Sequence, residues 1–163
     1  MIQIIQATAD TAPKIHALSQ ARLHSEGWSL QQYIDAARDS LLLCAVQGDS
    51  LLGFLQADVV YDTANLNLIA TDPAYARQGV ARRLIATACD ILDEYRAQNG
   101  FESLIFSLEV RSQNIPARSL YQSCGFEQAG LRRRFYTDPD DDAVIYCLPL
   151  GDAFCHRQNG VSP

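Results

Sequence analysis

Apolar residues recur along this chain with two different periods, and each change of period marks a new strand or helix. In chain order the pattern predicts a strand at 2–6, helices at 9–20 and 29–39, strands at 41–46, 51–61 and 65–71, a helix at 79–98, a strand at 103–110, a helix from 114 to 124, and strands at 126–136 and 143–150. Residues 151–163 have no such period, which predicts a loose C-terminal tail behind a single domain at 1–150.

Turn-forming residues support these boundaries. A Gly-Asp pair at 48–49 predicts a hairpin, and an Asn-Gly pair at 99–100 predicts the end of the long helix. The side of that helix expected to pack on a sheet carries Val80, Leu84, Ala88, Ile91 and Tyr95.

The connection between the strand at 65–71 and the long helix has the residues of an anion site. Pro73 disfavours a helical conformation at Asp72, so the strand ends there, and Gly79 allows a close approach to the backbone. The first helical turn leaves its N–H groups without partners and carries a partial positive charge, which suits a phosphate or pyrophosphate. An ordinary connection between a strand and a helix explains the same residues equally well.

A carboxylate stands near the end of the next buried strand. Glu109 closes a mostly apolar run, and it is interpreted either as a proton acceptor or as one half of a salt bridge, with Arg111 as its expected partner. Asn114 can cap the following helix, and Gly125 can end it. Tyr121 lies on the inward side of that helix, where periodicity alone predicts a core residue.

Composition narrows the class of protein. With 163 residues, of which 48% are hydrophobic, the chain can bury the core of one domain. The net charge of −6 argues against a nucleic-acid platform and favours an encounter with a basic protein. No apolar stretch has the length of a membrane span or the pattern of a signal peptide, so a cytoplasmic protein without a membrane partner is expected.

Metal and disulfide sites are not expected. The five cysteines and three histidines are scattered without the short spacings of a zinc site or a disulfide framework. Three consecutive arginines near the C-terminus are interpreted as solvated charges beside a core, in preference to a phosphate or RNA patch. These residues are Cys44, Cys89, Cys124, Cys147, Cys155, His16, His24, His156, Arg132, Arg133 and Arg134.

Two segments carry a resemblance to a known family. Residues 76–81 read Ala-Arg-Gln-Gly-Val-Ala, which resembles motif A of the GNAT acetyltransferases, although Ala76 stands where that family usually has Gln or Arg. Residues 108–126 resemble the same region of bacterial ribosomal-protein-alanine N-acetyltransferases (RimI type), and the resemblance extends over roughly residues 1–150. The loop at 138–142 departs from the family's usual turn.

The resemblance implies a GNAT fold of mixed α/β (α+β) class, in which a central mixed sheet of about seven strands has helices on both faces. It implies acetyl-CoA as cosubstrate and no metal. The pantetheine arm would follow the strand before motif A, the pyrophosphate would bind the motif itself, and one residue would stand on the far wall. In this order the expected residues are Ile69, Ala70, Thr71, Arg77, Gln78, Gly79, Val80, Ala81, Arg82 and Asn114.

The resemblance also implies the roles of the two catalytic candidates. Glu109 would be the general base, acting through water, and Tyr121 the general acid that protonates the sulfur of CoA. The implied acceptor is the N-terminal alanine of a small-subunit ribosomal protein, which is a basic protein. The alternatives are a GNAT enzyme for another protein N-terminus, a lysine or a small amine, and a non-catalytic CoA-binding module.

Two further groups of residues keep two interpretations each. Trp28, Tyr33 and Tyr136 either line an acceptor groove or belong to the core. An acidic loop either attracts a basic residue of the acceptor or is a solvated turn. That loop contains Asp138, Asp140, Asp141 and Asp142.

Overall fold

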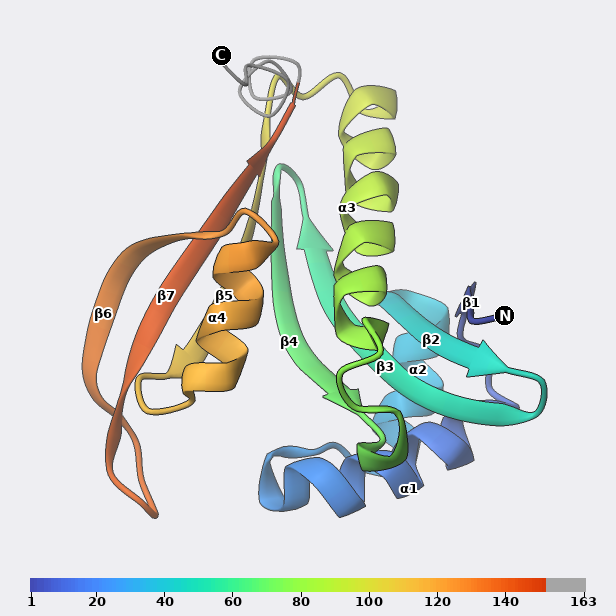
Figure 1. The fold of residues 1–163 in the computed structure, drawn as a ribbon. Helices are drawn as coiled ribbons and strands as arrows, with labels where there is room; N and C mark the ends of the chain where they lie inside the picture. The colour runs from blue at the N-terminus through green and yellow to red at the C-terminus, as the bar shows by residue number, and fades with distance from the viewer. Residues whose placement is uncertain (152–163) are drawn as a thin grey trace, which may run out of the picture. The chain divides into compact units, whose positions relative to one another are not determined.

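The fold is given by a computed structural model that describes residues 1–151, apart from the side chain of Ser25. Beyond Gly151, the tail expected at 151–163 lies outside the described residues, together with Cys155 and His156. The elements, labelled in Figure 1, are β1 (Gln3–Gln6), α1 (Ala12–Leu23), η1 (His24–Glu26), α2 (Leu30–Asp39), β2 (Leu41–Gln47), β3 (Ser50–Val60), β4 (Thr63–Thr71), η2 (Pro73–Tyr75), α3 (Val80–Gln98), β5 (Leu104–Arg111), α4 (Ile115–Ser123), β6 (Glu127–Tyr136) and β7 (Asp141–Leu150).

The seven strands form one mixed sheet in the order β1-β2-β3-β4-β5-β7-β6. Every strand and helix predicted from the sequence is present, with most boundaries within two or three residues of the prediction. The two short 3-10 helices, η1 and η2, were not predicted. The chain divides into two compact units, one of residues 1–59 with 66–88 and one of residues 60–65 with 89 onward.

The first unit contains β1, β2 and β3, which pair antiparallel, and the helices α1 and α2. A β-bulge interrupts the pairing of β2 with β3 between Ala45 and Val46. Tyr33 of α2 is fully buried, and its ring stands edge-on to Phe54 of β3 at a centroid distance of 5.6 Å. Its hydroxyl donates to Ser19 Oγ of α1 at 2.6 Å, so one side chain joins two helices and the sheet.

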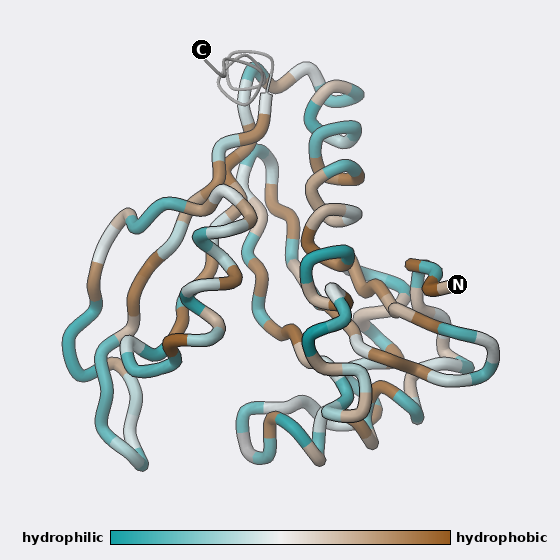
Figure 2. Tube along the Cα trace, viewed as in Figure 1, coloured by the Kyte–Doolittle hydropathy of each residue, from teal (hydrophilic) through white to brown (hydrophobic). Residues whose placement is uncertain are grey.

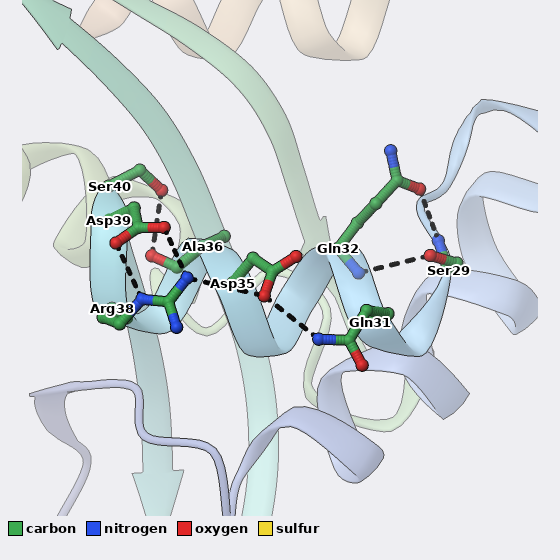
Figure 3. Close-up of polar contacts among 8 residues, drawn as sticks. All are labelled: Ser29, Gln31, Gln32, Asp35, Ala36, Arg38, Asp39 and Ser40. Carbon is green, nitrogen blue, oxygen red and sulfur yellow. Dashed lines mark hydrogen bonds and ion pairs between the residues drawn. The ribbon is translucent and has the colours of Figure 1, made fainter.

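Helix α2 begins where its sequence predicts. Ser29 accepts a hydrogen bond from the Gln32 backbone N–H, while the Gln32 side chain accepts one from the Ser29 N–H, which is a capping box (Figure 3). The remaining polar contacts drawn there join Gln31 to Asp35, Arg38 to Asp35 and Asp39, and Ser40 to the Ala36 carbonyl. The polar side chains along α2 and at its two ends therefore bond to one another and to the backbone of the helix.

In the second unit, β7 lies between β5 and β6 and pairs antiparallel with both. Helix α4 lies against these strands (Figure 1). Tyr121 of α4 stands beside Tyr146 of β7 at a ring-centroid distance of 6.3 Å. The edge strand β6 is largely hydrophilic, in contrast to the apolar β7 next to it (Figure 2). All three arginines at 132–134 are exposed, as predicted.

One part of the long-helix prediction is wrong. Ile91 of α3 is 37% exposed, whereas Leu92 is almost fully buried. The next buried position after Ala88 therefore lies four residues on, not three, because a helix of 3.6 residues per turn drifts between the two spacings. The buried positions of α3 are Val80, Leu84, Ile85, Ala88, Leu92 and Arg96.

Candidate active site

The connection from β4 to α3 is a tight turn closed by Asp72. This residue has extended backbone angles, as the following proline requires, and its carboxylate accepts a hydrogen bond from the Ala74 N–H at 2.9 Å. Further along, Arg77 and Gly79 both have left-handed backbones, with φ of 61° and 78°. Two left-handed residues so close together turn the chain sharply into the helix.

Helix α3 presents its first amides at this turn. The N–H of Arg83 donates to the Gly79 carbonyl at 3.0 Å, which is the first four-residue hydrogen bond of the helix. The N–H groups of Val80, Ala81 and Arg82 come before it, at the helix end where backbone N–H groups have no partner inside the helix. A Cβ built on Gly79 would meet no atom within 4 Å, so the space beside this residue is open. The turn therefore offers a positive helix end and room for a ligand, which fits the pyrophosphate of a CoA thioester.

Gly53 of β3 belongs to the same region, and the sequence interpretation missed it. A Cβ at this position would lie 2.7 Å from the Ala70 carbonyl oxygen and 3.0 Å from a methyl carbon of Val80. The missing side chain thus lets the end of β4 and the start of α3 approach β3. An isolated glycine inside a strand pattern is the signal that could have identified it.

The residues predicted to bind cosubstrate fall into groups with different surroundings. Ala70 and Val80 are buried, while Ile69, Thr71 and Ala81 are half-buried. In the second unit, the expected far-wall residue Asn114 is the N-cap of α4, and its side-chain oxygen accepts from the Ala117 N–H at 3.3 Å. The exposed members of the predicted set are Arg77, Gln78, Gly79, Arg82 and Asn114.

Glu109 lies on a sheet face that α4 does not cover. Paired residues of antiparallel strands point to the same face, and Glu109 pairs with Ile145 while Leu108 pairs with Tyr146. Because Tyr121 contacts the Tyr146 ring, α4 lies on the face opposite to Glu109. The two catalytic candidates therefore stand on opposite faces of the sheet within the second unit.

The salt-bridge partner predicted for Glu109 is wrong. Its Oε1 atom lies 3.2 Å from Nε of Arg132, and the carboxylate side chain is 30% exposed. Arg111 instead lies 4.4 Å above the ring of Tyr136 and donates to the Pro139 carbonyl at 2.9 Å. The partner comes from β6, two strands away, which the position of Glu109 in the sequence cannot indicate.

Tyr121 is buried but accessible at its hydroxyl. Burial is the main cause that raises its pKa far above the ordinary value, followed by the nearby Tyr136 and Cys124. Within residues 1–151 its hydroxyl makes no hydrogen bond, yet this region has no side-chain oxygen that is both enclosed and unsatisfied, so the hydroxyl reaches solvent. The raised pKa therefore keeps the proton on Tyr121 at neutral pH.

Half of the acidic loop has a structural role that neither interpretation included. Asp141 accepts hydrogen bonds from the Ser112 hydroxyl and from the Gln113 N–H, the latter at 3.2 Å. The Ser112 bond is the largest cause that lowers the pKa of Asp141. Asp142 accepts from the Arg134 N–H at 2.8 Å, so these two carboxylates hold the end of the β6–β7 hairpin, whereas Asp138 and Asp140 are exposed.

The three aromatic candidates also differ in their surroundings. Tyr33 is a core residue, which is the second of its two interpretations, because its ring fills the space between α1, α2 and β3. Trp28 is half-buried and packs on Tyr33 at a ring-centroid distance of 5.8 Å. Tyr136 is half-buried beneath Arg111.

Among residues 1–151 no cluster of three His, Cys, Asp or Glu side chains could hold a metal ion. The four cysteines in this part of the chain are free thiols, and burial raises the pKa of Cys44 to about 11 and that of Cys89 to about 12. None of the helices at 1–151 combines the length and hydropathy needed to cross a membrane.

Comparisons with known proteins identify relatives of this chain. Residues 4–126 match the model of the Acetyltransferase (GNAT) family. The ribosomal protein bS18-alanine N-acetyltransferase of Escherichia coli K12 is 36% identical over 134 residues, which cover 80% of this chain and 86% of that protein.

Solved structures agree with the sequence matches. The crystal structure of the ribosomal-protein-S18-alanine N-acetyltransferase from Escherichia coli has a TM-score of 0.79 at 32% identity, covering 93% of this chain and 95% of that one. Arabidopsis thaliana NAA60 in complex with acetyl-CoA has a TM-score of 0.76 at 15% identity, covering 91% and 99% of the two chains, and shows likeness of fold alone.

Proposed function

The chain belongs to the GNAT family of acetyltransferases, and we propose that it acetylates the N-terminal alanine of a small-subunit ribosomal protein of the bS18 type. It is an acetyl-CoA-dependent N-acetyltransferase. The observation that carries the proposal is the start of α3, where the first helix amides follow the open space beside Gly79 in a chain of this family.

The cosubstrate residues act mainly through their backbone. The amides of Gly79, Val80 and Ala81 would bind the pyrophosphate, because a helix N-terminus binds an anion without needing a side-chain cation. This explains why Ala76 can replace the family's usual polar residue, since it removes one side-chain contact and no backbone donor. Ile69, Ala70 and Thr71 would follow the pantetheine arm at the end of β4.

Transfer to an amine needs a group that takes up a proton and a group that releases one. Acetyl-CoA supplies the acetyl group as a thioester. In the proposal, the Glu109 carboxylate takes the proton that the attacking amine loses, by way of a water molecule, and the Tyr121 hydroxyl gives its proton to the departing sulfur.

The choice of acceptor rests on the relatives and on charge. The relative that is 36% identical acts on the alanine of ribosomal protein bS18. A net charge of −6 favours the encounter with a basic protein, and two of the acidic residues that contribute to it, Asp138 and Asp140, are exposed on the β6–β7 hairpin. A ribosomal acceptor implies that the enzyme works in the cytoplasm.

The test is a panel of free N-terminal peptides that differ only in the first residue, followed by CoA release and by mass-spectrometric location of the acetyl group. We expect the peptides that begin with alanine to be acetylated most efficiently. Preference for another first residue would move the enzyme to another protein terminus. Transfer only to small amines would reject a protein acceptor, and acetyl-CoA binding without any CoA release would reject catalysis.

A further inference from the structure

A series of two arginine and two aromatic side chains extends from Glu109 along the end of β6 to Arg111 of β5. The Arg132 guanidinium, which pairs with Glu109, lies 5.5 Å above the ring of Phe135. Phe135 stands edge-on to Tyr136 at a centroid distance of 5.0 Å, and Arg111 lies over the Tyr136 ring. We call Arg132, Phe135, Tyr136 and Arg111 the arginine–aromatic series.

An irregularity of β6 creates this series. The pairing of β6 with β7 shifts between Arg132 and Tyr136, and Arg134 in this stretch has a left-handed backbone, with φ of 54°. A bulge of this kind redirects side chains that a regular strand would point to alternate faces. It explains why Phe135 is 47% exposed, since the ring lies beside a guanidinium at the surface instead of in the core.

The ion pair leaves the Glu109 carboxylate partly exposed. The Nε atom of Arg132 lies 3.2 Å from Oε1, and the Glu109 side chain is still 30% exposed, so a water molecule can reach it. Gly130 and Ile145 share a row of the sheet with Glu109, and neither offers a hydrogen-bond donor from its side chain. Arg132 is thus the charged side chain that orients Glu109 on this face.

We propose that Arg132, supported by the Phe135 ring, is a positioning residue that holds the Glu109 carboxylate in the orientation needed to accept a proton. The inference rests on the proposed role of Glu109 in acetyl transfer. Misplacing a catalytic group by about 1 Å can cost about 10²-fold in rate. A single exposed contact holds its partner only partly, so we expect a smaller effect here, of about 10-fold.

The experiment compares three variants of the full chain with the wild type. Arg132→Gln should lower kcat by about 10-fold while leaving KM for acetyl-CoA unchanged, because Glu109 is not among the residues proposed to bind acetyl-CoA. Arg132→Lys keeps a cation and should recover kcat to within about 3-fold of the wild type. Arg133→Gln is the control, since Arg133 is the adjacent exposed arginine and makes no ion pair within residues 1–151.

Two further measurements separate positioning from a general loss of structure. The melting temperature of Arg132→Gln should stay within about 3 °C of the wild type, because exposed ion pairs contribute little to stability. Phe135→Leu keeps an apolar side chain but removes the ring. Its kcat should be about 2- to 5-fold lower than that of the wild type.

A double-mutant cycle decides the inference. If Arg132 acts through Glu109, then adding Arg132→Gln to Glu109→Gln should change kcat by less than about 2-fold. Equal losses in both backgrounds, or a wild-type kcat for Arg132→Gln, would overturn it and leave the proposed function intact. Wild-type turnover in Glu109→Gln would instead reject the catalytic role of Glu109, and absence of transfer by the wild type would reject the function.

Discussion

At the scale of single residues, the proposed binding of acetyl-CoA depends first on the backbone at Gly79. Valine at this position would place a branched side chain in the open space where the pyrophosphate is proposed to bind, at a left-handed φ that valine adopts poorly. We predict that Gly79→Val weakens acetyl-CoA binding by at least about 10-fold in isothermal titration, more than Arg83→Ala does.

Gly48→Val is the matched control for Gly79→Val. Gly48 also has a positive φ and open surroundings, but it lies in the β2–β3 hairpin, so its substitution imposes the same backbone strain away from the proposed site. Unchanged affinity in Gly79→Val, or an equal loss in Gly48→Val, would show that the anion site is misplaced.

Glu109 carries the second residue-scale prediction. Glu109→Gln keeps the shape of the side chain but cannot take up a proton, so kcat should fall by about 10² to 10⁴ while the affinity for acetyl-CoA stays nearly the same. Steady-state kinetics and titration of the same preparation measure both quantities. A combined loss of kcat and affinity would point to damage of the cosubstrate site.

Residue types and spacing were enough to single out Glu109 and Gly79, because a strand-end carboxylate and a turn glycine are local signals. The partner of Glu109 was not predictable in this way. Arg132 reaches Glu109 because β7 pairs with both of their strands in a register that puts the two side chains on the same face, and this register depends on pairing between distant segments. Gly53 was missed for the same reason, since its neighbours come from β4 and α3.

At the scale of elements, Gly53 controls the approach of β4 and α3 to β3. A Cβ there would collide with the Ala70 carbonyl, which is backbone and cannot rotate away. We predict that Gly53→Ala destabilises the protein by about 1 to 3 kcal/mol in denaturant unfolding and raises KM for acetyl-CoA.

Gly130→Ala serves as the stability control for Gly53→Ala. The nearest atom to a Cβ on Gly130 is a methyl carbon of Ile145 at 3.4 Å, which is ordinary contact with a flexible side chain. This variant should unfold within about 1 kcal/mol of the wild type. Equal stability of Gly53→Ala and the wild type would contradict the proposed close approach.

The β6–β7 hairpin carries a pH-dependent contact through Asp141. Its pKa is lowered in the folded protein, mainly by the Ser112 hydroxyl, so the charged form stabilises the fold at pH above the unfolded value of about 4. This contribution is lost as the pH falls through the lowered folded value. We predict that the melting temperature of Asp141→Asn lies below that of the wild type at pH 5–8 and that the gap closes below about pH 4.

Asp140→Asn provides the comparison within the same loop. Asp140 is exposed and makes no hydrogen bond to another residue within 1–151, so its variant should follow the wild type at every pH. A gap between Asp141→Asn and the wild type that stays constant down to pH 3 would show that the carboxylate charge has no part in the contact.

Most boundaries of helices and strands were predictable, because the hydrophobic period and the capping residues that mark them involve residues close together in the sequence. The capping box at Ser29 is an example, since both of its hydrogen bonds join residues three apart. Ile91 shows the limit, because three- and four-residue spacings are equally helical and only packing decides between them. The role of the acidic loop depended on its contact with Ser112, which the sequence separates widely from it.

At the scale of the whole molecule, we propose that this GNAT enzyme acetylates a peptide α-amine. With pKa values of about 7.7 to 8.0 for an α-amine and 10.4 for lysine, roughly 10% of the former and only about 0.04% of the latter are neutral at pH 7. One carboxylate acting through water suffices for the more available amine. An enzyme can depress the pKa of a bound lysine, so the availability of the amine alone does not decide the acceptor.

The most direct test uses two matched peptides that begin Ala-Arg. One has a free N-terminus and no lysine, and the other has a blocked N-terminus and an internal lysine. Both are incubated with the enzyme and acetyl-CoA at pH 7, and mass spectrometry locates the acetyl group. We predict acetylation of the α-amine in the free peptide and little modification of the blocked one. Preferential acetylation of the lysine in the blocked peptide would contradict it.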